Sequence, residues 1–205
     1  MSQNATKIGL EDEEYTWKEY VDLAIRTKST LNPLTNDVNE RGLNADVLHG
    51  VIGLATENDE LRIGIENMDH PNIKEELGDM FWYIAIITRG LKIDHEWSKL
   101  VETRYNEIES IDDIMELERC IAELLDIVKR VMFYGTHYNG SSFEKHLKDL
   151  YLNLIVYIGF DEELDYQEIL KLNINKLKAR YPNKFNMDNS INRDLEAERK
   201  VLEGE

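Results

Sequence analysis

Two acidic pairs, separated by a stretch that interrupts a helix, constrain this chain more than any other feature. Glu57 and Glu60 form the first pair, and Glu76 and Asp79 form the second. Residues three positions apart lie on the same face of a helix, so each pair directs two carboxylates the same way. Between the pairs, residues 69–72 (DHPN) contain a proline that a helix interior does not tolerate. The chain is therefore expected to reverse there and form two antiparallel helices.

Such a helical hairpin would bring all four carboxylates to one point. Carboxylate oxygen is the ligand type that Mg²⁺ and Mn²⁺ prefer, and converging negative charges are tolerated only with a bound cation. We therefore predict a Mg²⁺ site, with Mn²⁺ as a possible substitute, whose ligands are Glu57, Glu60, Glu76 and Asp79. The two pairs lie at the same position along the axes of the two helices only if the first helix ends near residues 64–67, ahead of the DHPN segment.

The sequences around these acids resemble those of a known family. HGVIGLATENDEL contains the first pair, and EELGDMFWYIA contains the second. A further block, NINKLKARYPNKF at residues 173–185, is followed by RDLEAER at residues 193–199. Together these blocks resemble the all-α nucleoside triphosphate pyrophosphatases of the MazG type, especially phage MazG-like proteins, which are related to the dimeric all-α dUTPases.

The resemblance implies an all-α fold, the helical bundle of the MazG-like pyrophosphatases. It also implies Mg²⁺-dependent hydrolysis of a nucleoside triphosphate, expected to be a deoxynucleotide, at the α–β phosphate bond to give a monophosphate and pyrophosphate. Glu57, Glu60, Glu76 and Asp79 would then be the catalytic acids, one of which acts as general base. The expected assembly is a homodimer or tetramer, located in the host cytoplasm if the protein is phage-encoded.

The second block predicts a wall that binds substrate. Asn173 and Lys176 are three residues apart and Arg180 follows one turn later, so an amide and two cations share a helix face. Asparagine reads sugar or base edges, whereas lysine and arginine suit phosphates. The alternative interpretation is a solvated basic helix face, although a local cluster of cations is unusual in so acidic a chain.

Three ring-bearing residues are further candidates for contact with the nucleotide. Trp17, near Tyr20, fits either core packing or stacking on a base. His49 lies two turns before Glu57 on nearly the same face, and could touch substrate, orient a carboxylate or be purely structural. Trp82, which follows the second acidic pair, is a candidate wall of the base pocket.

Composition excludes several classes of function. The 24 Lys and Arg residues against 41 Asp and Glu give a formal net charge of −17, which argues against nucleic-acid binding. That charge would also repel a free triphosphate, so substrate binding needs a metal and a local basic patch. The chain has no membrane-spanning apolar run and no cleavable signal pattern, which predicts a soluble cytoplasmic protein.

Cys120 is the single cysteine, which excludes an internal disulfide and fits a reducing compartment. It falls on an apolar helical stripe without a Cys/His motif, and we interpret it as a structural thiol in preference to a nucleophile.

Helical periodicity predicts a loose N-terminus at residues 1–14 and a single all-α domain at residues 15–205. Asn72 is the expected start of the helix that carries the second acidic pair, with Glu75 completing a capping box. Glu75 and Asp59 adjoin the acidic motif but are displaced by one position. Four other acids, including Glu198, are assigned to solvent.

Further helices are expected at about 15–31, 44–67, 94–109, 113–133, 143–158, 166–181 and, in the charged C-terminal segment 187–205, at 191–202.

The middle of the chain predicts a degenerate internal repeat with halves 45–109 and 115–181. KEELGDMFWYIAII at residues 74–87 aligns with FEKHLKDLYLNLIVY at residues 143–157, which sets Asp149 opposite Asp79. The first half keeps the acids and the second keeps the Asn-x-x-Lys block, so we expect that block to face the acids within one chain. The alternative is that helix periodicity alone produces the match.

Two other functions use acidic residues in a similar arrangement. A di-iron carboxylate bundle needs paired Glu-x-x-His motifs, and none of the five histidines follows a glutamate at that spacing. A non-catalytic regulator of the same family, binding a nucleotide or a partner, is harder to exclude. Such a regulator would be expected to have lost an acid, and all four acids are present.

Overall fold

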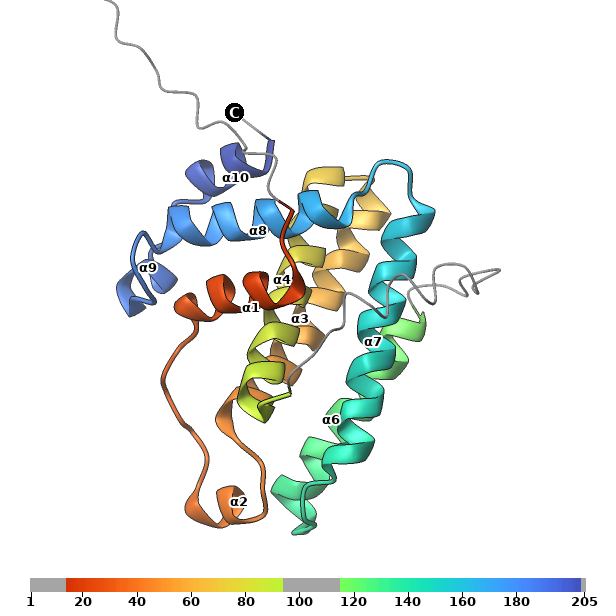
Figure 1. The fold of residues 1–205 in the computed structure, drawn as a ribbon, viewed down its shortest axis with the longest axis vertical. Helices are drawn as coiled ribbons and strands as arrows, with labels where there is room; N and C mark the ends of the chain where they lie inside the picture. The colour runs from red at the N-terminus through yellow and green to blue at the C-terminus, as the bar shows by residue number, and fades with distance from the viewer. Residues whose placement is uncertain (1–13, 94–114, 204–205) are drawn as a thin grey trace, which may run out of the picture.

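The computed structural model describes residues 14–93 and 115–203, and every regular element in these ranges is helical (Figure 1). The predicted all-α class is therefore confirmed. The helix expected at residues 94–109 lies outside the described residues, as does nearly all of the N-terminal segment 1–14. The elements are α1 (Trp17–Ala24), η1 (Ile25–Thr27), α2 (Asn36–Glu40), α3 (Ala45–Asn67), α4 (His70–Leu91), α6 (Met115–Tyr134), α7 (Gly140–Phe160), α8 (Tyr166–Arg180), α9 (Met187–Ile191) and α10 (Leu195–Glu203).

Short polar side chains set the helix starts. Thr16 forms a capping box with Glu19, and the Asn44 side chain accepts a 2.9 Å hydrogen bond from the amide of Val47. The Asp165 side chain similarly accepts from the amide of Glu168 at 2.7 Å. These caps satisfy backbone donors that have no partner inside the helix. The starts predicted for α3 and α8 are correct for this reason.

The reversal between α3 and α4 differs in detail from the prediction. α3 ends at Asn67, inside the predicted range, and Met68 turns the chain in the left-handed conformation with φ 53°. α4 begins at His70, because Asp69 rather than Asn72 is its N-cap. Pro71 falls in the first turn, where its missing N–H would have had no helical partner. The proline therefore starts the second helix, and the helix break lies just before it.

The α3–α4 hairpin lies at the centre of the molecule. α1 and α8 cross α4, and the α6–α7 hairpin runs alongside the central pair (Figure 1). Close packing of α3 against α4 depends on Gly53, where a Cβ atom would lie 2.1 Å from the Tyr83 ring. Residues 84–88 of α4 are all buried. The central hairpin thus fixes the positions of both acidic pairs.

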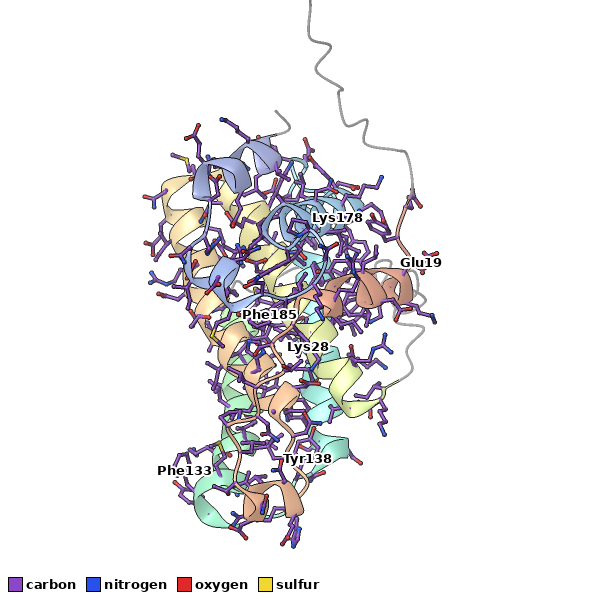
Figure 2. The ribbon with its side chains drawn as sticks, turned by 90° about the vertical axis from the view of Figure 1, so that its left-hand side faces the viewer. Glu19, Lys28, Phe133, Tyr138, Lys178 and Phe185 are labelled. Atoms are coloured by element: carbon purple, nitrogen blue, oxygen red, sulfur yellow. The ribbon has the colours of Figure 1, made fainter. Side chains whose placement is uncertain are left out.

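The remaining elements complete the bundle. The loop predicted at residues 32–44 contains the short helix α2, which lies beside the turn between α6 and α7. Tyr138 in that turn donates its amide to the carbonyl of Arg41 at 2.8 Å. Tyr138 and Phe133 mark this end of the molecule, far from Lys178 of α8 (Figure 2). The C-terminal segment forms two short helices, α9 and α10, instead of the single helix expected at residues 191–202.

Cys120 is buried on α6, and Asn153 of α7 donates to its Sγ at 3.6 Å. Burial raises the pKa of the thiol, which fits the structural role predicted for it.

The second repeat half predicted at residues 115–181 contains α6, α7 and α8 in this order, but the repeat itself stays a prediction. None of the described helices is long and apolar enough to cross a membrane.

Candidate functional site

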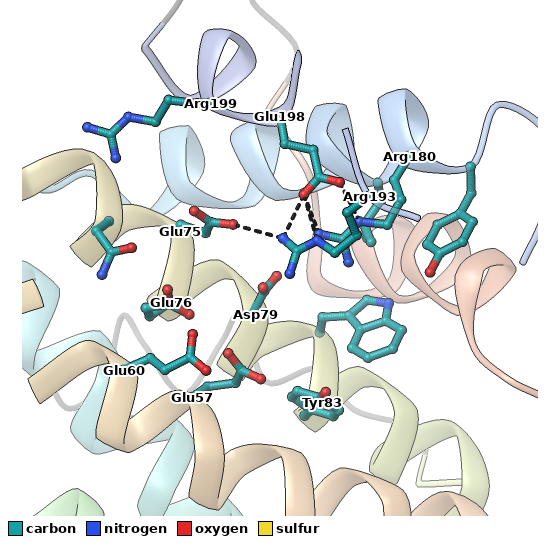
Figure 3. A pocket seen from close by; sticks show the side chains of 14 residues that line it. Glu57, Glu60, Glu75, Glu76, Asp79, Tyr83, Arg180, Arg193, Glu198 and Arg199 are labelled. Atoms are coloured by element: carbon teal, nitrogen blue, oxygen red, sulfur yellow. Dashed lines mark hydrogen bonds and ion pairs between the residues drawn. The ribbon is translucent and has the colours of Figure 1, made fainter. Parts of the chain in front are cut away.

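Three of the four predicted acids form a tight cluster between α3 and α4. Glu57 from α3 and Glu76 and Asp79 from α4 each place a carboxylate oxygen within 4.8 Å of the others. Glu60 lies in the same pocket but is exposed and outside this cluster (Figure 3). The i+3 spacing on each helix, combined with the sharp turn at Met68, produces this convergence. The sequence predicted that all four carboxylates converge at one point, which holds for Glu57, Glu76 and Asp79 but not for Glu60.

Crowding shifts the acid–base behaviour of the cluster. Glu76 is only 4% exposed, and burial raises its pKa to about 10, helped by the hydrogen bond that it shares with Glu57. Burial and the negative charge of Asp79 raise the pKa of Glu57 to about 7. A proton or a cation must therefore offset the repulsion. Three clustered carboxylates are a donor set that suits a hard, oxygen-seeking ion such as Mg²⁺ or Mn²⁺.

α8 supplies two groups that hold Asp79. Asn173 Nδ2 donates to Asp79 Oδ1 at 2.7 Å, and Lys176 Nζ lies 2.5 Å from Oδ2. The Tyr20 hydroxyl donates to Asn173 Oδ1 at 2.8 Å, which fixes the orientation of the amide. Each carboxylate oxygen of Asp79 keeps a second lone pair, so these contacts leave it able to bind a cation. The expected approach of the Asn-x-x-Lys block to the acids within one chain is observed.

Lys176 is completely buried. Burial by itself would lower the pKa of its ammonium group, but the charges of Asp79 and Glu75 outweigh burial and raise it. Lys176 Nζ also donates to Glu75 Oε1 at 3.2 Å. The lysine is therefore a fixed internal cation that offsets part of the negative charge of α4. Its neighbour Glu75, which the sequence left beside the motif, is its second acidic partner.

Gly78 allows this arrangement. A Cβ atom at Gly78 would lie 2.9 Å from Cβ of Asn173, closer than real Cβ atoms approach another atom. Only glycine lets α8 come near enough to α4 for Asn173 to reach Asp79. The glycine before Asp79 in the EELGDM sequence is thus part of the site.

A cluster of arginines lies on the opposite side of the same pocket. Arg180 of α8 and Arg193, which precedes α10, both contact the carboxylate of Glu198 (Figure 3). Glu198 was assigned to solvent from the sequence, and this was wrong, because it is only 3% exposed. Burial would raise the pKa of this carboxyl, but the hydrogen bonds from the two guanidinium groups outweigh burial and lower it. Arg193 also lies 3.7 Å from Glu75, which links the two sides.

Acids and arginines share a single cavity of about 400 Å³. This volume falls within the range of small-molecule sites. The lining residues come from α3, α4, α8 and the C-terminal segment (Figure 3). They are Glu57, Glu60, Asn72, Glu75, Glu76, Asp79, Trp82, Tyr83, Leu177, Arg180, Tyr181, Arg193, Glu198 and Arg199.

The structure separates the three ring-bearing candidates. Trp82 lines the cavity, and its Nε1 donates to the Ala24 carbonyl and to Thr27 Oγ1, both at 3.1 Å. His49 is half-buried against the rings of Trp82 and Tyr83 and does not line the cavity. Trp17 is 3% exposed and packs in the core, so core packing is the correct one of its two interpretations.

Two other candidates also lie elsewhere than expected. Asn173 and Lys176 were predicted to bind substrate, but both are buried and neither lines the cavity. The amide of Asn173 and the ammonium group of Lys176 instead contact the carboxylates of Asp79 and Glu75 inside the fold. Arg180 alone of the predicted α8 wall reaches the cavity. Arg193 lies in the RDLEAER block and Tyr83 in the EELGDMFWYIA block, so the sequence held a signal for both, although neither was singled out.

No protein-family model, curated protein or solved structure matches this chain.

Proposed function

We propose that this protein hydrolyses a nucleoside triphosphate, a deoxynucleotide in the first instance, to the monophosphate and pyrophosphate with Mg²⁺ as cofactor. The observation that carries the proposal is the combination of a three-carboxylate cluster and two arginines in one cavity. Carboxylates hold divalent cations, and guanidinium groups bind phosphate in a two-pronged geometry. A metal-bound polyphosphate is the ligand class that needs both.

The acids of the cluster are the proposed ligands of the cation. Glu57, Glu76 and Asp79 would hold it, and Mn²⁺ would serve in its place. The bound ion would supply charge neutralisation for the phosphates of the substrate. Asn173 and Lys176 then act as positioning residues, because they hold both oxygens of Asp79 in place.

Glu60 is the proposed partner of the attacking water. It lines the cavity, is exposed, and lies outside the three-carboxylate cluster, so its carboxylate is available to accept a proton. Attack of this water on the α-phosphorus breaks the bond to the α–β bridging oxygen, and pyrophosphate leaves. Arg180 and Arg193 would neutralise the phosphates that depart.

Trp82 and Tyr83 form the aromatic part of the cavity and are the proposed contacts of the base. They are adjacent on α4, one turn beyond Asp79, so a base lying against them would leave its phosphates next to the acids. The resemblance of the same sequence blocks to MazG-type pyrophosphatases agrees with this reaction, and the homodimer or tetramer that it implies stays a prediction.

The test is product analysis for a panel of deoxynucleoside and nucleoside triphosphates with Mg²⁺. We expect monophosphate and pyrophosphate in equal amounts from at least one nucleotide, and none when Mg²⁺ is chelated. Glu57→Gln and Glu60→Gln should reduce kcat by at least about 10²-fold, the lower end for loss of an acid–base group. Asp59→Asn is the matched control, because Asp59 is on the same helix but is exposed and paired with Arg62 at 2.8 Å.

Formation of a diphosphate and phosphate would contradict attack at the α-phosphorus. A folded wild type that binds Mg²⁺ but turns over no nucleotide in the panel would refute the enzyme and leave the non-catalytic regulator as the better interpretation.

A further inference from the structure

The carboxylate of Glu198 has the surroundings of a bound anion. Its Oε1 accepts from Arg180 Nε at 2.8 Å, and its Oε2 accepts from Arg180 Nη2 at 2.5 Å. Arg193 adds contacts to Oε2 from Nη2 at 2.7 Å and from Nε at 3.2 Å. Two guanidinium groups thus converge on one anionic group with two-pronged geometry. This is the arrangement by which arginines bind phosphate.

Glu198 belongs to a short helix beside the cavity. It lies on α10, which packs on α8 and α4 at the mouth of the cavity (Figure 3). Arg199 lies 3.4 Å from Asp69, and Leu202 is buried but outside the main hydrophobic core. α10 has only nine residues, and a short helix at the periphery of a fold opens locally at a lower free energy than the core helices do. Its detachment would leave the core intact.

With Glu198 in place, its carboxylate already occupies hydrogen-bond donors of both Arg180 and Arg193. An entering polyphosphate meets acids on one side and an occupied arginine pair on the other. Direct binding of a phosphate by Arg180 and Arg193 requires that the Glu198 carboxylate leave them. The two anions therefore compete for the same pair of cations.

We propose that Arg180 and Arg193 form a phosphate subsite that Glu198 occupies in the absence of ligand, and that a polyphosphate displaces Glu198 and releases α10 from the cavity. The identity of the ligand as a triphosphate rests on the proposed function. The exchange itself requires only a phosphate chain, so it is tested without nucleotide hydrolysis. α10 is then a self-inhibiting latch that opens when substrate binds.

A permanent brace is the competing interpretation of Glu198. In that case Glu198 holds the two arginines in the geometry that the phosphate needs, and its loss weakens phosphate binding. The latch predicts the opposite sign, because removal of a competing anion strengthens binding. One neutral substitution therefore separates the two.

The first experiment measures the Kd of inorganic tripolyphosphate, with Mg²⁺ present, by calorimetry on the full chain. Glu198→Gln keeps the shape of the side chain and removes its charge. We expect the Kd to fall by about tenfold, the factor for a site that the latch closes about 90% of the time. Glu196→Gln is the matched control, since Glu196 is exposed on the same helix and paired with Lys200, and its Kd should equal that of the wild type. A weaker or unchanged Kd for Glu198→Gln would overturn the latch, as would the absence of tripolyphosphate binding to every variant.

The second experiment needs no variant, and so holds even if Glu198→Gln misfolds. Amide hydrogen exchange in residues 195–203 of the wild type is followed before and after addition of tripolyphosphate. Faster exchange in α10 with ligand bound supports its release, whereas slower or unchanged exchange in the saturated protein contradicts it. Turnover of nucleotides together with a protected α10 would leave the proposed function intact and refute the latch alone.

Discussion

Lys176 Nζ lies 2.5 Å from Oδ2 of Asp79, across the contact between α8 and α4. The lysine is entirely buried, so its end of the pair lies inside the fold, whereas Asp79 lines the cavity. The same ammonium group reaches Glu75, and Asn173 takes the other oxygen of Asp79. The acid cluster on α4 is therefore held in place by a charge that a distant segment supplies. This relationship is open to direct tests.

Replacement of Lys176 by methionine should strongly destabilise the protein. The substitution preserves much of the side-chain volume but leaves Asp79 and Glu75 without their buried cation, which costs about 3–5 kcal/mol when one partner of a buried pair is removed. Urea unfolding followed by circular dichroism measures the loss. The double variant Lys176→Met with Asp79→Asn should recover part of it, since the uncompensated charge is then gone. If the double variant loses as much unfolding free energy as the two single variants together, Lys176 and Asp79 are not coupled.

Gly78→Ala should separate α8 from α4. The added methyl group would lie 2.9 Å from Cβ of Asn173, and overpacking of this kind costs about 1–3 kcal/mol. Because Asn173 then moves from Asp79, we also expect a lower Mg²⁺ affinity. Thermal unfolding and Mg²⁺ titration check the two effects. Gly140→Ala is the control, because a Cβ atom at Gly140 would meet its nearest atom at an ordinary 3.6 Å. Equal behaviour of the two variants would contradict the proposed role of Gly78.

Mg²⁺ should stabilise the fold by binding to the three-carboxylate cluster. A ligand at 100 times its Kd that binds only the native state adds about 2.7 kcal/mol of stability. Thermal midpoints measured across a Mg²⁺ titration should rise in the wild type and in Asp59→Asn, but not in Glu57→Gln or Asp79→Asn. A rise of similar size in all four proteins would place the ion elsewhere.

Without divalent cations, the stability of the protein should fall as the pH rises. The pKa of Glu57 is raised by burial to about 7 and that of Glu76 to about 10, from 4.5 in the unfolded chain. The native state therefore binds more protons than the unfolded state above pH 4.5, and stability decreases from there through about pH 7. Glu76→Gln, which mimics the protonated acid, should flatten this slope between pH 5 and 8. Unfolding in EDTA across this range gives the slope of the unfolding free energy against pH. Identical slopes in the wild type and in Glu76→Gln would contradict the raised pKa assigned to Glu76.

The helices and the acid cluster could be predicted because their determinants are local. Capping by Asn44 and Asp165 and the i+3 spacing of the acids depend on residues within one or two turns. The range for the end of α3 followed from the same geometry. The start of α4 was misplaced because Asp69 and Asn72 are both good caps, and the proline at position 71 fits the first turn of a helix as well as it fits a break.

The roles of the α8 residues and of Glu198 were decided by the tertiary structure. The sequence by itself determined an all-α chain, the convergence of Glu57, Glu76 and Asp79, to which it wrongly added Glu60, and the cations available on α8. It left open whether Lys176 faces a ligand or a carboxylate, because that choice depends on how closely α8 approaches α4 at Gly78. The assignment of Glu198 to solvent was wrong, because only the return of α10 to the cavity brings this carboxylate to Arg180 and Arg193. Charge pairing between segments far apart in sequence has no local pattern, so only the folded chain shows which charges meet.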